Sequence, residues 1–358
     1  MRKIPVGILG ATGMVGQRFV TLLENHPWFE VVILAASPRS AGRSYRDAVG
    51  DRWRLATPMP KYAKKLNVYA VEEDLPKIAK QVRLIFSALD MEKDAIKTLE
   101  IAYATRGVAV VSNNSAHRWT EDVPMIMPEI NPEHTDLIHS QRKRRGWDGG
   151  LIVVKPNCSL QSYIPVIHAL REFKPAEIEV TTLQAISGAG KTFSSWPEMV
   201  DNCIPFIGGE EEKTEKEPLK ILGTIKNASL VIAKKPRISA TCIRVAVADG
   251  HMASVAVKFS IKPTLQQIIA AIQGYKNPIK ELSLPSAPTP FLQYFTEENR
   301  PQTNMDRDVG KGMAISCGRF REDPLFDWKF VSLSHNTIRG AAGGALLTAE
   351  LLKAKGLL

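Results

Sequence analysis

Residues 6–17 read VGILGATGMVGQ, and this stretch decides the fold of the first half of the chain. Residues 6–9 predict a short apolar strand, glycines follow at positions 10, 13 and 16, and a helical pattern continues to residue 25. A strand, a glycine-rich turn and a helix in this order form a phosphate cradle, because glycine permits a tight turn and the start of a helix attracts an anion. The spacing G-x-x-G-x-x-G is longer than the G-x-G-x-x-G fingerprint, but its place between a strand and a helix predicts dinucleotide binding.

Further apolar runs read as buried strands at 31–36, 82–86, 108–111 and 151–154. Helical segments alternate with them, which is typical of a doubly wound parallel sheet. We therefore predict an α/β fold with an N-terminal Rossmann-type domain over residues 1–157. Ligands bind such sheets beyond the carboxyl ends of the strands.

The loop after the strand at 31–36 bears on the choice of cofactor. NAD-preferring sites place an Asp or Glu there to hold the ribose 2′-hydroxyl group. This chain has Ser37, Arg39 and Ser40 instead. A guanidinium group and hydroxyl groups favour a 2′-phosphate, so we predict NADP rather than NAD. The alternative is an ordinary polar loop.

Cys158 follows the strand at 151–154 by way of the tripeptide KPN, and a helix-like run comes after it. Free backbone N–H groups at a helix start and the helix dipole stabilise a thiolate, which is a strong nucleophile. We interpret Cys158 as a catalytic nucleophile, and the alternative is a small buried apolar residue. Ser87 and Asn114 also follow strand ends, so the three side chains are expected to converge on one crevice.

The second half of the chain has runs of strands rather than alternation. Residues 177–184, 241–248 and 255–261 alternate in polarity, and we interpret the last two as a hairpin. The sequence therefore predicts an α+β catalytic and dimerisation domain with a mainly antiparallel sheet over residues 158–336. The C-terminal helix, 337–358, is expected to join the first domain.

Two polar side chains stand out in this second half. Arg244 lies within an apolar run, and because an unpaired buried guanidinium is costly, a carboxylate on a partner or substrate is its natural companion. His251 lies at the predicted hairpin turn, where a proton donor or acceptor and a plain surface histidine both remain open. The highly charged segment 208–217 opens a helix and is typical of a solvated helix face.

Composition limits the class of protein. The chain has 358 residues, 44% hydrophobic and 23% charged, which suits two globular domains. No apolar run approaches the ~20 residues of a membrane span, and the N-terminus lacks the pattern of a signal peptide. Four scattered cysteines without CxxC spacing argue against disulfides and a metal site, and favour a reducing, cytoplasmic compartment.

The net charge is +10, which suits phosphorylated small substrates and cofactors as well as nucleic acid. The one dense basic run, at 142–145, is interpreted as a solvated surface loop. No aromatic side chains are interleaved with it, so we expect no nucleic-acid binding.

In combination, these motifs resemble the aspartate-semialdehyde dehydrogenase family, in its archaeal and fungal branch. The motifs are GATGMVGQ at 10–17, PNC at 156–158, LQAISGAG at 183–190, GEEEK at 209–213 and RVAVADGH at 244–251. They follow one another over almost the whole chain. The resemblance implies NADPH-dependent reduction of L-aspartyl-4-phosphate to L-aspartate 4-semialdehyde with release of inorganic phosphate, a step of amino-acid biosynthesis that leads toward lysine, methionine and threonine.

The resemblance also implies roles for individual residues. Cys158 is expected to form a thioester, His251 to act as general acid–base group and Gln184 to orient the acyl intermediate. The residues expected to bind substrate and phosphate are Arg244, Glu210, Lys213, Arg118 and Asn114. Those expected around NADP are Gly10, Thr12, Gly13, Met14, Val15, Ser37, Arg39, Ser40, Ser87, Ser187, Gly188 and Asn336. The resemblance further implies a homodimer or homotetramer.

Three other functions remain as alternatives. Malonyl-CoA reductase and N-acetyl-glutamyl-phosphate reductase are the nearest enzymes, but the Glu210 carboxylate suits a free amino group, which only aspartyl phosphate carries. An NADP-sensing regulatory protein is the alternative outside enzymes. The presence of both Cys158 and His251 counts against that reading.

Overall fold

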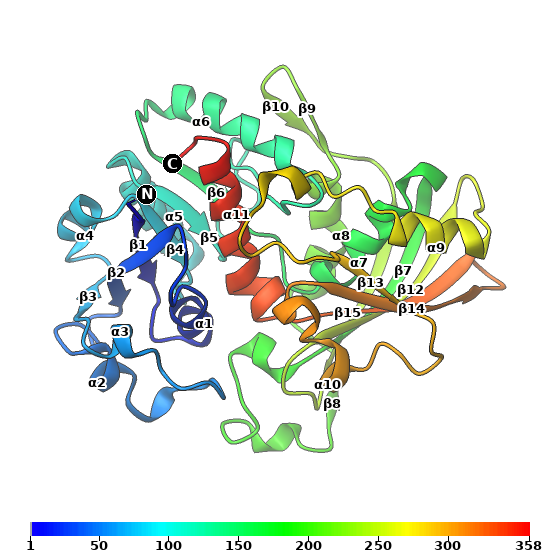
Figure 1. Cartoon of the computed structure of the whole chain (residues 1–358), viewed down its shortest axis with the longest axis horizontal. Helices are drawn as coiled ribbons and strands as arrows, with labels where there is room; N and C mark the ends of the chain where they lie inside the picture. The colour runs from blue at the N-terminus through cyan, green and yellow to red at the C-terminus, as the bar shows by residue number, and fades with distance from the viewer. Residues whose placement is uncertain (1) are drawn as a thin grey trace.

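The computed structural model describes residues 2–358 and contains two large β-sheets side by side (Figure 1). The first sheet has six parallel strands in the order β3-β2-β1-β4-β5-β6. Its strands are β1 (Ile4–Leu9), β2 (Phe29–Ala36), β3 (Val68–Ala70), β4 (Leu84–Ser87), β5 (Ala109–Ser112) and β6 (Leu151–Val154). This order is that of a Rossmann-type sheet, so the predicted fold of the first half is confirmed.

Helices cover both faces of the first sheet. On one face, α1 (Met14–Leu22) and α11 (Gly343–Ala354) bury apolar side chains against β1 and its neighbours. On the other face, α4 (Leu75–Gln81) and α5 (Lys93–Thr105) do the same. The helix α11 therefore packs on the first sheet, while the division of the chain into domains at residues 157 and 336 stays a prediction.

The second sheet has seven strands in the order β13-β14-β15-β12-β7-β11-β8. Its strands are β7 (Pro175–Gln184), β8 (Cys203–Ile204), β11 (Arg237–Val245), β12 (His251–Phe259), β13 (Leu292–Phe295), β14 (Ile315–Glu322) and β15 (Trp328–Ser334). Four of its six pairings are antiparallel, so the prediction of a mainly antiparallel sheet is confirmed.

The predicted hairpin of β11 and β12 is wrong. β7 lies between them, pairing in parallel with β11 and antiparallel with β12. Sequence proximity and a short connecting turn suggest a hairpin, but β7 supplies the buried partner for both strands. His251 is therefore the first residue of a central strand, and its side chain is fully buried.

The remaining helices are short or surround the second sheet. They are α2 (Tyr45–Val49), α3 (Lys61–Lys64), α6 (Leu137–Arg145), α7 (Leu160–Ala169), α8 (Glu210–Ile221), α9 (Leu265–Gln273) and α10 (Thr303–Asp306). The 3₁₀ turns are η1 (Gly50–Arg52), η2 (Pro132–Asp136), η3 (Arg171–Phe173), η4 (Ile186–Ala189), η5 (Pro197–Met199), η6 (Lys280–Leu282) and η7 (Val309–Gly312), and η8 (Ile338–Ala342) is a π-helical turn. A small hairpin joins β9 (Thr224–Lys226) and β10 (Ser229–Val231).

The basic run at 142–145 is the last turn of α6, not a loop. Cations are favourable at that position, because the carbonyl end of a helix carries partial negative charge. Three of the four also make tertiary contacts: Arg142 donates to the Gly149 and Gly150 carbonyls, Arg144 pairs with Glu121, and Arg145 pairs with Asp122. Across residues 2–358, no helix has the length and apolar character that crossing a bilayer requires.

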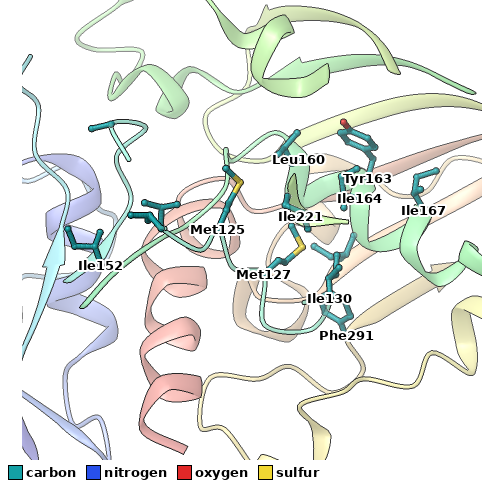
Figure 2. Close-up of a cluster of buried hydrophobic side chains, with 14 of the residues drawn as sticks. Met125, Met127, Ile130, Ile152, Leu160, Tyr163, Ile164, Ile167, Ile221 and Phe291 are labelled. Atoms are coloured by element: carbon teal, nitrogen blue, oxygen red, sulfur yellow. The ribbon is translucent and has the colours of Figure 1, made fainter. Parts of the chain in front are cut away.

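One hydrophobic cluster joins the two sheets (Figure 2). Ile152 comes from β6, Met125 and Met127 come from the connection between β5 and β6, and Leu160 and Ile164 come from α7. The turn that carries Cys158 connects β6 to α7, so it lies at this junction. Continuous packing on both sides restricts the movement of that turn.

Candidate active site

Cys158 lies between the end of β6 and the start of α7 and is half-buried. Asn157 shapes the turn, because its Oδ1 accepts hydrogen bonds from both the backbone N–H and the hydroxyl of Ser159, each at 2.8 Å. Gly340 packs directly on the cysteine: a Cβ at position 340 would lie 2.9 Å from the Cys158 Cβ. The position of the sulfur is therefore fixed from two sides.

The prediction that the helix start favours a resting thiolate is wrong. Burial raises the pKa of the Cys158 thiol, and the nearby Glu210 carboxylate adds to this effect. Lys155, Arg118 and Arg244 act in the opposite direction but do not outweigh burial. The helix begins only at Leu160, two residues beyond the sulfur. The thiol therefore needs a proton acceptor before it can act as a nucleophile.

Glu210, the first residue of α8, connects the groups around Cys158. Its carboxylate accepts hydrogen bonds from the Asn157 amide at 3.0 Å, Lys213 at 2.7 Å and Gln184 at 3.4 Å. Lys213 stays about a third exposed, whereas Gln184 is buried. The structure thus brings together three residues that the sequence assigned to one site, and adds Asn157 to them.

The prediction that the charged run of α8 is a solvated face is only partly right. Glu210, Thr214 and Glu217 lie on one buried face, at the i, i+4, i+7 spacing of a helix. Glu217 pairs with Arg118 at 2.8 Å and accepts the backbone N–H of Asn157 at 2.7 Å. Arg118 also donates to the carbonyls of Lys155 and Asn113. All three nitrogens of its guanidinium group are thus engaged, two of them with groups that hold the KPN turn, rather than being free for phosphate.

We expect Glu217→Gln to lower the free energy of unfolding by about 3–5 kcal/mol, because it leaves the buried Arg118 guanidinium without its counter-charge. Chemical denaturation measures this difference. Glu212→Gln is the matched control, since Glu212 is exposed on the same helix and pairs with Lys216 at the surface. Equal stability of the two variants would show that the Arg118–Glu217 pair does not hold the turn.

His251 is held as one tautomer. Its Nδ1 accepts the backbone N–H of Ala185 at 3.1 Å, so in the neutral ring the hydrogen is on Nε2. Burial and the Arg244 charge lower the pKa of His251 to about 3, so the ring is neutral at physiological pH. Within residues 2–358, its buried Nε2 has no hydrogen-bond partner. A buried donor without an acceptor points to a ligand oxygen.

Arg244 ends up beside His251. Its Nη1 donates to the Ala185 carbonyl at 2.7 Å, so residue 185 orients both side chains. Gly188 leaves room in front of them: a Cβ there would lie 2.8 Å from the Arg244 Nη1 and 3.0 Å from the His251 Nε2. The absence of a side chain at Gly188 therefore leaves space beside the two buried donors, where a substrate group could meet them.

The other predicted residues fall into two linked pairs. Asn336 donates to the Ser187 hydroxyl at 2.8 Å and accepts the backbone N–H of Gly250, the neighbour of His251. Asn114 donates to the Ser87 hydroxyl at 2.9 Å and to the buried Glu100 carboxylate at 3.1 Å. Ser87 and Asn114 thus converge beyond neighbouring strand ends, as predicted. The Asn336 pair also holds the backbone of Gly250, whereas the Asn114 pair is anchored by the Glu100 carboxylate.

The turn between β1 and α1 fits a dinucleotide phosphate. Gly10 has a φ of +76°, and a Cβ there would lie 2.1 Å from the Ala88 carbonyl oxygen. Exposed Gly13 caps α1 without a side-chain hydrogen bond, and no acidic residue lies in the first helical turn. Thr12, Met14 and Val15 line the same turn and are partly exposed. The N–H groups of the helix start are therefore available to an anion.

The loop after β2 fits a phosphorylated ribose. Ser37 and Arg39 are exposed and Ser40 is buried, with its N–H bonded to the Ser37 carbonyl at 2.9 Å. No carboxylate occurs between residues 37 and 46 to hold a 2′-hydroxyl group. The accessible Arg39 guanidinium is the group suited to a 2′-phosphate.

Sequence reasoning missed Lys155 and Glu217, and it gave Asn157 no role of its own. Glu217 had a usable signal, namely its spacing of seven residues from Glu210 on the same helix. Lys155 follows a buried apolar strand directly, which marks a lysine with little access to water. The charged groups around Lys155, such as Arg118, Glu217 and Arg339, come from segments far away in the sequence.

Comparisons with known proteins agree with this fold and site. The family model described as "Semialdehyde dehydrogenase, NAD binding domain" matches residues 5–138, and "Semialdehyde dehydrogenase, dimerisation domain" matches residues 167–339. The two halves of the molecule together thus define a semialdehyde dehydrogenase architecture.

Relatives that match over the full length identify the family within this class of dehydrogenases. The aspartate-semialdehyde dehydrogenase of Archaeoglobus fulgidus is 41% identical over 350 residues, which cover 98% of each chain. That of Schizosaccharomyces pombe is 41% identical over 359 residues, with 99% of each chain covered. This chain belongs to the aspartate-semialdehyde dehydrogenase family. The predicted resemblance, including its archaeal and fungal relatives, is confirmed.

Solved structures show the same arrangement. The Candida albicans aspartate semialdehyde dehydrogenase with NADP superposes with a TM-score of 0.89 at 37% identity, and all of both chains is covered. The Vibrio cholerae aspartate semialdehyde dehydrogenase II, solved with ASA, gives a TM-score of 0.74 at 26% identity and covers 99% of each chain.

Proposed function

We propose that this protein catalyses the NADPH-dependent conversion of L-aspartyl-4-phosphate to L-aspartate 4-semialdehyde and inorganic phosphate, through a thioester on Cys158. The observation that carries this proposal is the constellation at the end of β6. Cys158 is half-buried, and the positive charge of Arg244 favours its ionisation. The Arg244 guanidinium and the His251 Nε2 both border the space left by Gly188. Within residues 2–358, this Nε2 has no hydrogen-bond partner. The relatives and neighbours named above support the choice of substrate.

Each residue has a task in this reaction. The Cys158 sulfur attacks the acyl phosphate carbon, the bond to phosphate breaks, and a thioester forms. The Nε2–H of His251 donates to the thioester oxygen and stabilises the negative charge that develops there. Because the ring is neutral and its Nδ1 is occupied, we assign His251 this donor role rather than that of a proton shuttle. We assign Gln184 the task of orienting the acyl group.

Arg244 and Glu210 suit the two charged groups of the substrate backbone. The Arg244 guanidinium binds the α-carboxylate, and the Glu210 carboxylate meets the α-amino group. The partly exposed Lys213 is the more accessible cation for the departing phosphate, while Arg118 supports the site through its pair with Glu217. Glu210 favours aspartyl phosphate over malonyl-CoA or an acylated amine, since neither of these has a free amino group.

Residues at the edge of the first sheet and in the loops after β7 and β15 would hold NADP. Gly10, Thr12, Gly13, Met14 and Val15 suit its pyrophosphate, and the set that suits the adenosine ribose and the nicotinamide side is Ser37, Arg39, Ser40, Ser87, Ser187, Gly188 and Asn336. When bound as NADPH, the cofactor supplies the hydride that reduces the thioester. The chain supplies the sulfur that carries the acyl group, the hydrogen-bond donor to the thioester oxygen, and the side chains that bind the substrate.

Arg244→Lys should raise the KM for aspartate semialdehyde by about 10-fold or more with a smaller change in kcat, because lysine cannot make the bidentate contact of a guanidinium. Steady-state kinetics in the oxidative direction measure both constants. Arg237→Lys is the matched control, as Arg237 is exposed at the start of the same strand and pairs with Glu177. An unchanged KM in Arg244→Lys would show that Arg244 does not bind the substrate.

The function is tested by following NADPH formation from aspartate semialdehyde and NADP, with and without inorganic phosphate. We expect sustained turnover only when phosphate is present, and much lower rates with N-acetyl-glutamate semialdehyde or malonate semialdehyde plus coenzyme A. Turnover at the same rate without phosphate, or a preference for another substrate, would contradict the proposal. Binding of NADP without any turnover would favour the regulatory protein.

The assembly and its location complete the proposal. The match to a dimerisation domain supports a homodimer or homotetramer. We place the enzyme in the cytoplasm, where thiols stay reduced, and expect it to serve biosynthesis of the aspartate-derived amino acids.

A further inference from the structure

Arg339 is a fully buried arginine that the function above does not use. Its Nε donates to the Gln161 Oε1 at 3.0 Å, and its Nη1 and Nη2 donate to the two Glu129 carboxylate oxygens at 2.5 and 2.8 Å. Its Cζ also lies 5.0 Å from the centre of the Phe291 ring, which is labelled in Figure 2. Each guanidinium nitrogen has a partner, so the side chain is held in one position.

The three hydrogen-bonded residues join three segments of the chain. Arg339 belongs to η8, Glu129 to the connection between β5 and β6, and Gln161 to the first turn of α7. Glu129 and Gln161 are buried as well. An ion pair in the interior adds little net stability after desolvation, but its planar, bidentate geometry fixes the segments that carry it relative to one another.

The residue after Arg339 rests on the candidate nucleophile. A Cβ at Gly340 would lie 2.9 Å from the Cys158 Cβ and 3.3 Å from its Cα. Here η8 is π-helical, with the Gly340 N–H bonded to the His335 carbonyl at 2.9 Å, and such turns are frequent at functional sites. Arg339 therefore holds the turn of Cys158 at two points, through Gln161 three residues beyond it and through Gly340 against it.

The same segment reaches His251 at its other end. Asn336 accepts the backbone N–H of Gly250, the residue before His251, at 2.8 Å. It also donates to the Ser187 hydroxyl at 2.8 Å. Residues 336–340 thus connect the backbone beside the His251 donor to the backbone beside the Cys158 sulfur.

We propose that Arg339 is a positioning residue: its bonds to Glu129 and Gln161 fix segment 336–340, and that segment sets the placement of the Cys158 sulfur relative to the His251 donor. The kinetic consequence rests on the function proposed above. Reacting groups that are displaced by about 1 Å lose on the order of 10²-fold in rate. The groups assigned to the substrate backbone, Arg244 and Glu210, lie on β11 and α8, so kcat is expected to change rather than KM.

The first test is Arg339→Lys, which keeps a positive charge opposite Glu129 but cannot make the bidentate contact and the Gln161 bond together. We expect kcat for phosphate-dependent NADP reduction to fall by about 10–10²-fold. The KM for aspartate semialdehyde and the Kd for NADP should change by less than about threefold. Steady-state kinetics and an NADP titration measure the three constants.

Arg145→Lys is the matched control. Arg145, at the end of α6, pairs in the same bidentate way with the buried Asp122 carboxylate, and its Cζ lies 5.2 Å from the centre of the Trp147 ring. This variant should keep its kcat when both proteins are compared at a temperature at which thermal unfolding shows them folded. Arg339→Lys with lowered stability but an unchanged kcat would show a purely structural role and overturn the proposal.

The second test does not depend on turnover. It is the rate of Cys158 alkylation by iodoacetamide without substrate or cofactor, in a Cys203→Ser background because Cys203 is also exposed. Arg339→Lys should speed this alkylation by about threefold or more, since release of Gly340 opens the half-buried thiol to the reagent. An unchanged rate would overturn the proposal. An unmodified enzyme that shows no phosphate-dependent turnover would contradict the proposed function, and the alkylation result would still decide the role of Arg339.

Gln161→Met decides the matter if Arg339→Lys does not fold. It keeps the pair of Arg339 with Glu129 and removes only the bond to α7. We expect the same pattern at smaller size, with kcat lower by about 3–10-fold and an unchanged KM. A kcat equal to that of the unmodified enzyme would overturn the proposal.

Discussion

Cys158→Ala is expected to abolish phosphate-dependent NADP reduction, with kcat falling by at least ~10⁴-fold. The loss is large because the reaction needs an acyl group in a form that accepts hydride. A thioester is such a form, whereas no other side chain at the end of β6 can make one. The fold should survive, since the turn is held by Asn157 and Gly340 rather than by the sulfur.

NADP binding is the control for this variant. The phosphate cradle at Gly10 and Gly13 belongs to the first sheet and does not contact the cysteine turn, so the dissociation constant of NADP should change less than about twofold. Cys158→Ser should retain at most a trace of activity, because a hydroxyl group is a much weaker nucleophile than a thiol. Normal turnover by either variant would rule out a covalent route through this residue.

His251→Ala is expected to lower kcat by about 10²–10³-fold, the loss seen when one donor to a developing oxyanion is removed. His251→Gln is the informative partner, because its amide can accept the Ala185 N–H and still present a donor. It should recover part of the lost rate. Stopped-flow measurement of the chemical step compares the two variants directly.

The pH profile separates this donor role from a proton shuttle. Burial holds the pKa of His251 at about 3, below its ordinary value of 6.5, so the ring stays neutral from pH 5 upward. A depressed histidine pKa means that the unfolded chain binds the extra proton, and the histidine therefore costs stability as the pH falls below 6.5. We expect no inflection from His251 in kcat between pH 5 and 8. An inflection near pH 6.5 that disappears in His251→Gln would contradict the assigned tautomer.

The first sheet was predictable because its signals are local. Five of the six strands contain a run that reads as a strand from the sequence alone, and the glycine turn lies between the strand and the helix that it connects. The three-residue β3 was missed, because it is too short to give such a run. The same locality placed Ser87, Asn114 and Cys158 at strand ends, and the shared edge of a parallel sheet then brought them to one side.

The second sheet was less predictable because its pairings are distant in sequence. β7 enters between β11 and β12 and displaces the expected hairpin, a result that no property of the short turn at 246–250 reveals. Burial of one face of α8 has the same origin. Glu217 looks like a solvated residue until Arg118, nearly one hundred positions earlier, is brought against it.

Protonation states depend on such distant contacts most of all. A helix start predicts a stabilised thiolate, yet burial and Glu210 reverse the direction for Cys158. For His251 the sequence left donor, acceptor and surface roles open, and one backbone N–H from Ala185 selects the donor.

The most direct measurement is mass spectrometry of the enzyme after it reacts with aspartate semialdehyde and NADP in the absence of phosphate. Without phosphate the thioester has no acceptor, so an aspartyl group should accumulate on the peptide that contains Cys158, together with one NADPH released per site. Adding phosphate should discharge the adduct. An enzyme that turns over with no adduct, or that carries the acyl group on another residue, would contradict a thioester at Cys158.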